Sequence, residues 1–406
     1  MRNIGKMRAK WLAGAGLACV AVLAGFAASS AQNQSAASLR KSRPIGSEAS
    51  ISLSTADRVQ DEAWWPTKGK APRSAYAGNE ECDQCHHDKV TSQRQTEMAK
   101  ASTRSLDPAD LDGQQRVHFQ QGAYDYSIAR SGNIVAESVT DGRTSLSRPV
   151  LFSFGEGVVG HTYIYEDAGN LYESHVSYYS SIKGLDLTTG HPQAQFGDLS
   201  QALGRPLELQ EAQRCFGCHT TASTTSGRFD PSQAIAGVTC EACHGPGARH
   251  AQAMMAGQLE QGRKLIVSPG HFDTARAIDF CGACHRTPGD VIEMNVSGAV
   301  TVRFQPFRLE QSRCWKNAGE RLTCVTCHNP HEPLVQDSAA YDAICMRCHA
   351  AKPGGERQTG ELGVACRVSK VNCVGCHMPK VEIPGMHHAF ADHWIRVARD
   401  SDTYLN

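Results

Sequence analysis

The residues best suited to chemistry in this chain are cysteine and histidine, which occur 17 and 18 times among 406 residues. Fourteen of the cysteines share one repeated pattern with seven of the histidines, Cys-x-x-Cys-His. The seven copies, numbered here in chain order as motif 1 to motif 7, are Cys82-Cys85-His86, Cys215-Cys218-His219, Cys240-Cys243-His244, Cys281-Cys284-His285, Cys324-Cys327-His328, Cys345-Cys348-His349 and Cys373-Cys376-His377. Two cysteines at this spacing can form thioethers with the two vinyl groups of one porphyrin, and the following histidine can bind its iron. The pattern predicts seven covalently bound haem c groups.

Two other uses of cysteine pairs fit the sequence less well. A thioredoxin-like redox pair occurs once, near a βαβ pattern, and does not recur seven times with a histidine attached. Structural zinc would need four ligands for each metal ion, and unprotected thiols oxidise to disulfides in an exported protein. Haem attachment is therefore the favoured interpretation.

The other axial position of each iron decides whether the protein only carries electrons. A second protein ligand saturates the iron, whereas an open position admits a small substrate. Eleven histidines lie outside the motifs, and Met98 adds a thioether. His250 and His331 follow a motif histidine by six and three residues across turns rich in Pro and Gly, so each ring could serve a neighbouring haem. The full set of candidate second ligands is Met98, His118, His191, His250, His331, His388 and His393.

This surplus of ligands predicts an electron carrier without catalytic residues. The alternative is a multihaem reductase or other oxidoreductase, in which one five-coordinate haem acts on a small nitrogen or sulfur compound. A third possibility is a docking or filament-forming conduit, suggested by seven tyrosines that lie between residues 113 and 200. Cross-strand packing is the simpler explanation of these tyrosines, because tyrosine is enriched in strands.

The N-terminal segment predicts export to the periplasm. Four basic residues precede an uncharged apolar run from Trp11 to Ala28, and small residues follow it, as in a secretory signal peptide. If it stays uncleaved, this run is just long enough to anchor the chain in a membrane. The 41 basic and 41 acidic residues become 37 and 41 without residues 1–31, a net charge of −4. With no broad basic surface, nucleic acid is not an expected partner.

The hydrophobic pattern divides the chain into five parts. We expect a signal peptide at 1–31, a flexible lead-in at 32–74, a first haem-binding segment at 75–112, a β-rich insert at 113–200 and a six-haem-binding domain at 201–406. Short β-prone runs separated by turn residues predict strands at 116–121, 124–130, 133–140, 149–154, 161–166 and 171–179. The expected fold class is a mainly α-helical and irregular multihaem cytochrome c fold with an inserted antiparallel β-module.

Two cysteines of the exported chain, Cys314 and Cys366, belong to no motif. In an oxidising compartment the simplest expectation for such a pair is a disulfide bond. A thiolate ligand to an iron, or two free buried thiols, are the alternatives.

Three stretches of the chain resemble the multihaem c-type cytochromes of the cytochrome c-552/4 (cytochrome c554-like) family, typified by the tetrahaem electron carrier of nitrifying bacteria. They are Cys-Glu-Ala-Cys-His-Gly-Pro-Gly from Cys240 with His250, Leu-Thr-Cys-Val-Thr-Cys-His-Asn-Pro-His from Leu322, and Cys-Val-Gly-Cys-His-Met-Pro-Lys from Cys373 with Asp392-His393. The resemblance covers roughly residues 76–100 and 210–398. It implies periplasmic electron transfer, with quinol oxidoreductases or other cytochromes as redox partners.

Overall fold

The computed structural model describes residues 71–104, 111, 113–155, 159–318, 322–350 and 366–399, with the side chains of 316–318 left out. All of them belong to one unit, Ile51–Asn406. The expected signal peptide and nearly all of the lead-in lie outside the described residues. In the part that is described, no helix combines the length and the apolar character needed to cross a membrane.

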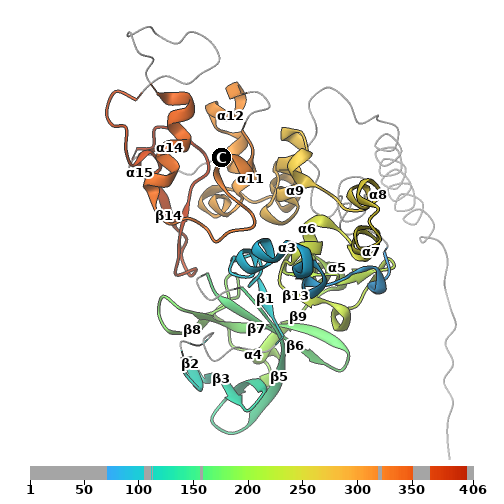
Figure 1. The fold of residues 1–406 in the computed structure, drawn as a ribbon. Helices are drawn as coiled ribbons and strands as arrows, with labels where there is room; N and C mark the ends of the chain where they lie inside the picture. The colour runs from blue at the N-terminus through green and yellow to red at the C-terminus, as the bar shows by residue number, and fades with distance from the viewer. Residues whose placement is uncertain are drawn as a thin grey trace, which may run out of the picture. The chain divides into compact units, whose positions relative to one another are not determined.

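A nine-stranded antiparallel sheet forms one part of this unit (Figure 1). Its continuous path runs in chain order from β2 to β8, and β2 also contacts β8, so the sheet nearly closes on itself. Near-closure leaves few unpaired strand edges exposed. The strands of this path are β2 (Arg116–Gln121), β3 (Tyr124–Ser131), β4 (Ile134–Thr140), β5 (Ser145–Phe154), β6 (His161–Asp167), β7 (Asn170–Tyr179) and β8 (Gly184–Leu187).

Two short strands outside the path join the sheet from neighbouring segments. β1 (Ser102–Thr103) pairs with β5, and β9 (Gly204–Pro206) pairs with β7. Gly204 must be glycine, because a Cβ there would lie 2.4 Å from the carbonyl oxygen of Glu173. The close pairing places Arg205 directly opposite Glu173.

The interior of the sheet is built from residues that alternate along the strands. Ile128, Val139, Val176 and Leu185 are buried there, together with the short helix α4 (Leu199–Leu203). Five of the seven tyrosines of this region are also buried: Tyr126, Tyr163, Tyr165, Tyr178 and Tyr179. The cross-strand packing interpretation of the tyrosines is confirmed.

The expectation of a mainly helical fold is wrong. The described residues are 39% helix and 24% strand, with the nearly closed sheet as a major element. The reason is physical: the strands of the predicted insert are long and pair into one sheet, whereas the haem-binding segments form only short helices joined by turns.

The second part of the unit consists of short helices joined by turns (Figure 1). Phe152 and Phe154 of the sheet pack edge-on against Phe216 of α5, with ring centroids 4.9 and 5.0 Å apart. This apolar contact fixes the sheet to the first helix of the second part. The helices and their bounds are α3 (Asn79–Gln93), α5 (Leu209–His219), α6 (Cys240–His244), α7 (Ala248–Met255), α8 (Leu259–Lys264), α9 (Thr274–His285), α10 (Pro288–Met294), α11 (Gln305–Glu310), α12 (Arg313–Ala318), α13 (Cys324–Cys327), α14 (Ser338–His349) and α15 (Cys373–His377).

Candidate functional site

Each Cys-x-x-Cys-His motif sits where helical backbone ends. Five helices end on the motif histidine itself, namely α5, α6, α9, α14 and α15. α13 ends one residue earlier, at Cys327, and in α3 the backbone leaves helical geometry at His86. A helical turn brings residues three apart to the same face, so both cysteines of a motif point to one side. The chain then turns away at the histidine, whose ring is free to project from the helix end.

Three motif histidines are oriented by a hydrogen bond from Nδ1 to a backbone carbonyl. The acceptors are Ala101 for His219 at 2.9 Å, Val267 for His244 at 2.8 Å and Arg396 for His377 at 2.8 Å. In metal-binding histidines the nitrogen that does not bind the metal commonly donates in this way, which fixes the tautomer and the ring orientation. Nε2 is then the nitrogen directed at the metal.

Three motif histidines face the ring of a second histidine. The ring centroids of His86 and His250 are 6.5 Å apart with planes inclined by 18°. Those of His244 and His331 are 6.0 Å apart at 13°. A metal between two imidazoles, at about 2.0 Å from each nitrogen, puts the two ring centroids roughly 6 Å apart. The spacing of both pairs fits one iron held between two rings.

The third pair joins His328 to His393, with centroids 6.3 Å apart and planes inclined by 43°. On the far side of these pairs, Nδ1 of His250 lies 2.9 Å from the Gly262 carbonyl oxygen, and Nδ1 of His393 lies 3.0 Å from that of Ala391. The second ring of a pair is therefore oriented in the same way as a motif histidine. This arrangement fits haem c with iron bound by both rings.

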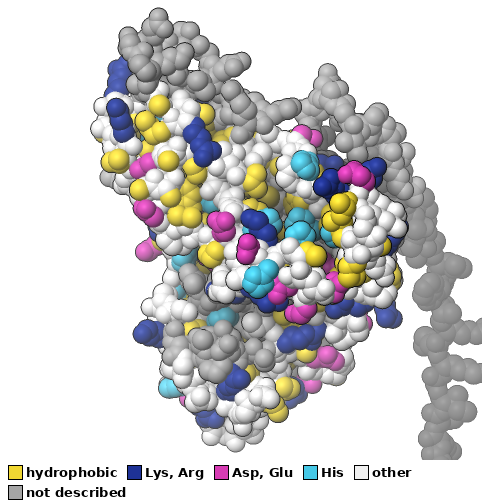
Figure 2. Space-filling view, in the orientation of Figure 1, with side chains coloured by type: hydrophobic (Ala, Val, Ile, Leu, Met, Phe, Trp, Pro, Cys, Tyr) yellow, Lys and Arg dark blue, Asp and Glu magenta, His cyan; other side chains and the backbone are white. Residues whose placement is uncertain are grey.

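The pairs follow a regular rule along the chain. Motif 1 faces a histidine that follows motif 3, motif 3 faces one that follows motif 5, and motif 5 faces one that follows motif 7. The turns after motifs 3 and 5 thus direct His250 and His331 towards another motif. Figure 2 shows histidine side chains gathered on the face over α3 and α6, beside acidic side chains.

Burial keeps several of these imidazoles neutral, the form that binds a metal. Desolvation lowers the pKa of His219, His285 and His328. It also lowers the pKa of His331, and that of His393 to about 4.

Side-chain contacts connect the motifs into an ordered series. The thiols of Cys82 and Cys240 hydrogen-bond between motifs 1 and 3, and those of Cys281 and Cys324 between motifs 4 and 5. The thiols of Cys345 and Cys373 do the same for motifs 6 and 7. One small cavity of about 40 Å³ is lined by cysteines of motifs 2, 3 and 4: Cys218, Cys243 and Cys284.

The link between motifs 5 and 6 is electrostatic, because the charge of Cys345 adds to burial in raising the pKa of Cys327 to about 11. The order in space is therefore motif 1, motif 3, motifs 2 and 4 together, then motifs 5, 6 and 7. Three motif cysteines are exposed: Cys85, Cys348 and Cys376. They belong to the first and the last two motifs of this order.

The remaining candidate ligands lie elsewhere. His118 is exposed on β2, and Met98 lies in the turn after α3, where its carbonyl accepts a hydrogen bond from the Val238 amide at 2.9 Å. The His388 ring packs edge-on against Phe390 at 4.8 Å. Both ring nitrogens of His191 already have partners, so this side chain is not oriented towards a motif.

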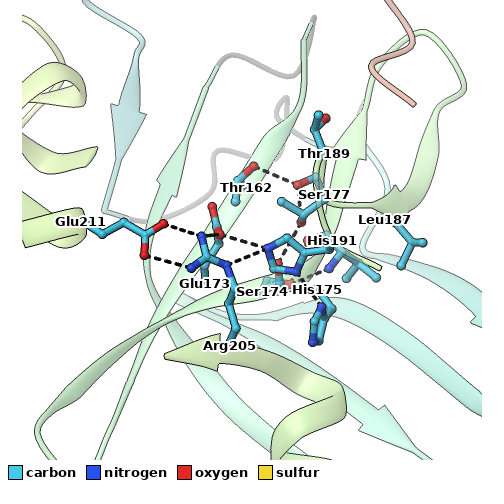
Figure 3. A network of polar contacts seen from close by, with 12 residues as sticks. Thr162, Glu173, Ser174, His175, Ser177, Leu187, Thr189, His191, Arg205 and Glu211 are labelled. Atoms are coloured by element: carbon cyan, nitrogen blue, oxygen red, sulfur yellow. Dashed lines mark hydrogen bonds and ion pairs between the residues drawn. The ribbon is translucent and has the colours of Figure 1, made fainter. Parts of the chain in front are cut away.

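His191 belongs to a polar network where the sheet meets α5 (Figure 3). Its members include Glu173 of β7, Arg205 of β9 and Glu211 of α5. The sequence analysis missed these charged residues, because no local spacing marks side chains that meet across three elements. Of these residues, Glu211 has a signal in the sequence, because it lies one helical turn before Cys215 of motif 2.

The disulfide expected between Cys314 and Cys366 is wrong, since both thiols are free. Cys314 is close enough to the motif cysteine Cys345 for its pKa to be raised by it, after the larger effect of burial. Cys366 is exposed, and its sulfur accepts the amides of Val368 and Ser369. The two cysteines lie in different environments.

Comparison with known proteins agrees with this geometry. The family model described as "Cytochrome c554 and c-prime" matches residues 172–245, which contain motifs 2 and 3. The multiheme cytochrome MtrA of Shewanella baltica (strain OS185) is 26% identical over 183 residues, covering 35% of this chain and 54% of that protein. The chain thus spans about half the length of the curated relative that it matches. No solved structure matches. Together with the repeated motifs, these similarities support a relationship between this chain and the multihaem c-type cytochromes.

Proposed function

We propose that this chain is an exported cytochrome with seven haems that conducts electrons along the ordered series of motifs. Each motif supplies two thioether cysteines and one histidine ligand. For motifs 1, 3 and 5 the second ligands are His250, His331 and His393. Haem c supplies reversible one-electron chemistry at iron, and the protein fixes the positions of the haems and their ligands.

The observation that carries this proposal is the unbroken succession of contacts from motif 1 to motif 7. Neighbouring motifs share thiol contacts, a common cavity or an electrostatic interaction. Porphyrins attached at such neighbouring sites lie near one another, which favours electron hopping. The exposed cysteines of motifs 1, 6 and 7 mark the two ends where redox partners exchange electrons. We expect these partners to be other cytochromes or a quinol oxidoreductase.

Export is part of the proposal because thioether formation and the N-terminal segment point the same way. The basic and apolar residues of 1–31 have the pattern of a secretory signal. The mass of the matured protein tests both points: we expect seven added haem groups and loss of the signal segment. A mass without added haem would contradict the proposal.

Conduction is tested with the exposed thiol of Cys366, close in sequence to motif 7. A photosensitiser attached there injects electrons one flash at a time while haem absorbance is followed. We expect seven haems to be reduced in the intact protein. When motif 4 is removed by C281A with C284A, the haems of motifs 5, 6 and 7 should still be reduced promptly and those of motifs 1, 2 and 3 much more slowly.

The matched control removes motif 1, which lies at the end of the series far from Cys366, by the substitutions C82A and C85A. This variant should reduce all six remaining haems at the rate of the intact protein. Equal rates for every haem after loss of motif 4 would overturn the proposed order. A haem that binds carbon monoxide and turns over a small nitrogen or sulfur compound would point to a reductase instead.

A further inference from the structure

A charged network lies between the sheet and motif 2 and is used by none of the haem attachments. We propose that His191 takes up a proton when the haem at motif 2 is reduced and releases it when that haem is oxidised. This inference rests on the proposed function, because the electron comes from the haem series. It adds proton coupling at one position of the series.

The network is compact and mostly buried (Figure 3). Nε2 of His191 lies 3.0 Å from Oε2 of Glu173 and 3.2 Å from Nε of Arg205. Nδ1 of His191 lies 2.6 Å from Nδ1 of His175. The guanidinium of Arg205 also donates to both carboxylate oxygens of Glu211, at 2.9 and 2.7 Å. The His191 side chain is only 3% exposed.

These contacts satisfy His191 both without and with an added proton. When the ring is neutral, Nδ1 donates to His175 and Nε2 accepts from the Nε–H of Arg205. When the ring is protonated, Nε2 instead donates to Oε2 of Glu173, while Nδ1 still donates to His175. Arg205 then loses its contact with Nε2 and keeps its hydrogen bonds to Glu173 and Glu211. A histidine whose two charge states are both hydrogen-bonded can change state without leaving a buried group unpaired.

The net charge of the network favours the added proton. Burial raises the pKa of Glu173, but its hydrogen bond with His191 and the charge of Arg205 outweigh burial and hold the pKa below its ordinary value. Two carboxylates and one guanidinium therefore give a net charge of −1. Protonation of His191 brings the network to neutrality.

His175 does not compete for this proton. Burial, followed by the charge of His191, lowers the pKa of His175 to about 4. The opposite face of the His175 ring packs on Phe196, with centroids 4.6 Å apart. Within the described part of the chain, the charged or titratable groups that contact His191 are His175 and Glu173 on β7 and Arg205 on β9, with Glu211 on α5 behind Arg205.

The network is electrostatically connected to motif 2. Glu211 lies four residues before Cys215 on α5, so the two side chains share a helix face. Burial, and then the charges of Glu173 and Glu211, raise the pKa of the Cys215 thiol to about 12. A charge in the network is thus felt at the attachment site of this haem.

Charge and proton balance follow directly. With haem held by Cys215, Cys218 and His219, one electron from the haem series would lower the local charge by one, and one proton from solvent on Nε2 of His191 would restore it. Oxidation returns the electron to the series and the proton to solvent. The proton reaches the network from the side where Arg205 and Glu211 are 39% and 31% exposed.

The test is a spectroelectrochemical redox titration of the intact holoprotein between pH 5.5 and 8.5, with each haem followed by magnetic resonance. For the haem at motif 2 we expect the midpoint potential to fall by up to about 59 mV for each tenfold drop in proton concentration, the conversion for one electron and one proton. H191Q should lose this slope. H118Q, which changes an exposed histidine of the same sheet, should keep it.

A second variant, E173Q, tests the inference if H191Q cannot be obtained as folded protein with its haems attached. E173Q removes the acceptor charge that stabilises protonated His191, so the pH range of the slope should move to lower pH. A motif 2 potential that is independent of pH in the native protein, or an unchanged slope in both H191Q and E173Q, overturns the inference. The seven reduction steps are counted in the same titration, so a missing haem would be recognised separately as failure of the proposed function.

Discussion

The ring of His86 faces the ring of His250 across 6.5 Å, although 164 residues separate them. His86 ends the first motif, and His250 lies on α7, just beyond the third. A gap of this size accommodates one metal ion bound to both rings. The relationship joins two distant segments into one site and gives the first prediction.

H250A should leave the haem at motif 1 with a single protein ligand. We expect this haem to change from low spin to high spin and to bind carbon monoxide, because an open axial position admits small ligands. Electron paramagnetic resonance and carbon monoxide difference spectra measure both effects. H271A, which removes an exposed histidine nearby in sequence, is the control. An entirely low-spin H250A protein would show that another residue is the ligand.

E241Q should loosen the connection between motifs 1 and 3. The buried Glu241 carboxylate accepts backbone amides from Ala77 at 2.7 Å, Gly78 at 2.9 Å and Gly247 at 2.7 Å. A glutamine keeps only one acceptor oxygen and sets its NH₂ group against an amide donor. We expect a loss of about 1–3 kcal/mol in the free energy of unfolding.

Denaturant unfolding of the holoprotein measures this loss. The control is E260Q, since Glu260 is an exposed residue paired only with Arg263 across one helical turn. Its effect should stay within about 0.5 kcal/mol. Equal effects of the two substitutions would show that Glu241 has no special role.

R308M should destabilise the C-terminal segment that carries His393. Arg308 and Asp392 form a buried ion pair with contacts of 2.9 and 2.8 Å, and their side chains are 2% and 0% exposed. Removal of Arg308 leaves the buried Asp392 carboxylate with its other partner, Arg396 at 2.7 Å, so we expect a loss smaller than that of a fully uncompensated buried charge, about 3–5 kcal/mol. Thermal unfolding and the spin state of the haem at motif 5 measure the effect. The double variant R308M/D392N should recover part of the lost stability. If it recovers none, the loss in R308M does not come from the ion pair with Asp392.

The same ion pair predicts acid sensitivity. Burial raises the pKa of Asp392, but the hydrogen bonds from Arg308, the Trp394 amide and Arg396, together with the charge of Arg308, outweigh burial and hold the pKa below its ordinary value. A carboxyl with a lowered pKa stabilises the fold above the pKa of the unfolded chain, about 3.9, and this contribution is lost as the pH falls through the lower, native value. Between pH 5 and pH 2 the free energy of unfolding should therefore fall less with decreasing pH in D392N than in the native protein.

E137Q should stabilise the sheet, and more so at high pH. Glu137 is fully buried, and desolvation raises its pKa to about 8. Between the pKa of an unfolded glutamate and about 8, the native state holds a proton that the unfolded state lacks, so stability falls as the pH rises. At pH 7 this cost is on the order of 3 kcal/mol. Melting temperatures of E137Q and native protein should differ more at pH 8 than at pH 5, and a constant difference would contradict this.

Local sequence patterns predicted the longer strands of the sheet but not its shortest strands. The β-prone runs between turn residues locate β2 to β7 within a few residues, because strand-forming residues and turn residues occupy separate stretches of this segment. The packing of the tyrosines followed from their enrichment in strands, and five of the seven are buried. The short β1 and β9 carry no such pattern, and they were missed together with the near-closure of the sheet.

Contacts between distant segments could not be predicted. The turns after motifs 3 and 5 indicated that His250 and His331 could serve other haems, but not which ones. His191 was a candidate ligand on residue type alone, whereas Glu173 and Arg205 meet it only because β9 pairs with β7. Which partner a histidine meets is decided by tertiary packing.

The rule that a motif faces a histidine from two motifs further along the chain has a consequence for biogenesis. As the polypeptide is synthesised, the histidine of motif 1 cannot meet its second ring until α7 has been made, nor the histidine of motif 5 until His393 has been made. Completion of these sites must then proceed in the direction of synthesis. A chain that stops between one of these motifs and its partner histidine would therefore lack one ring of that pair.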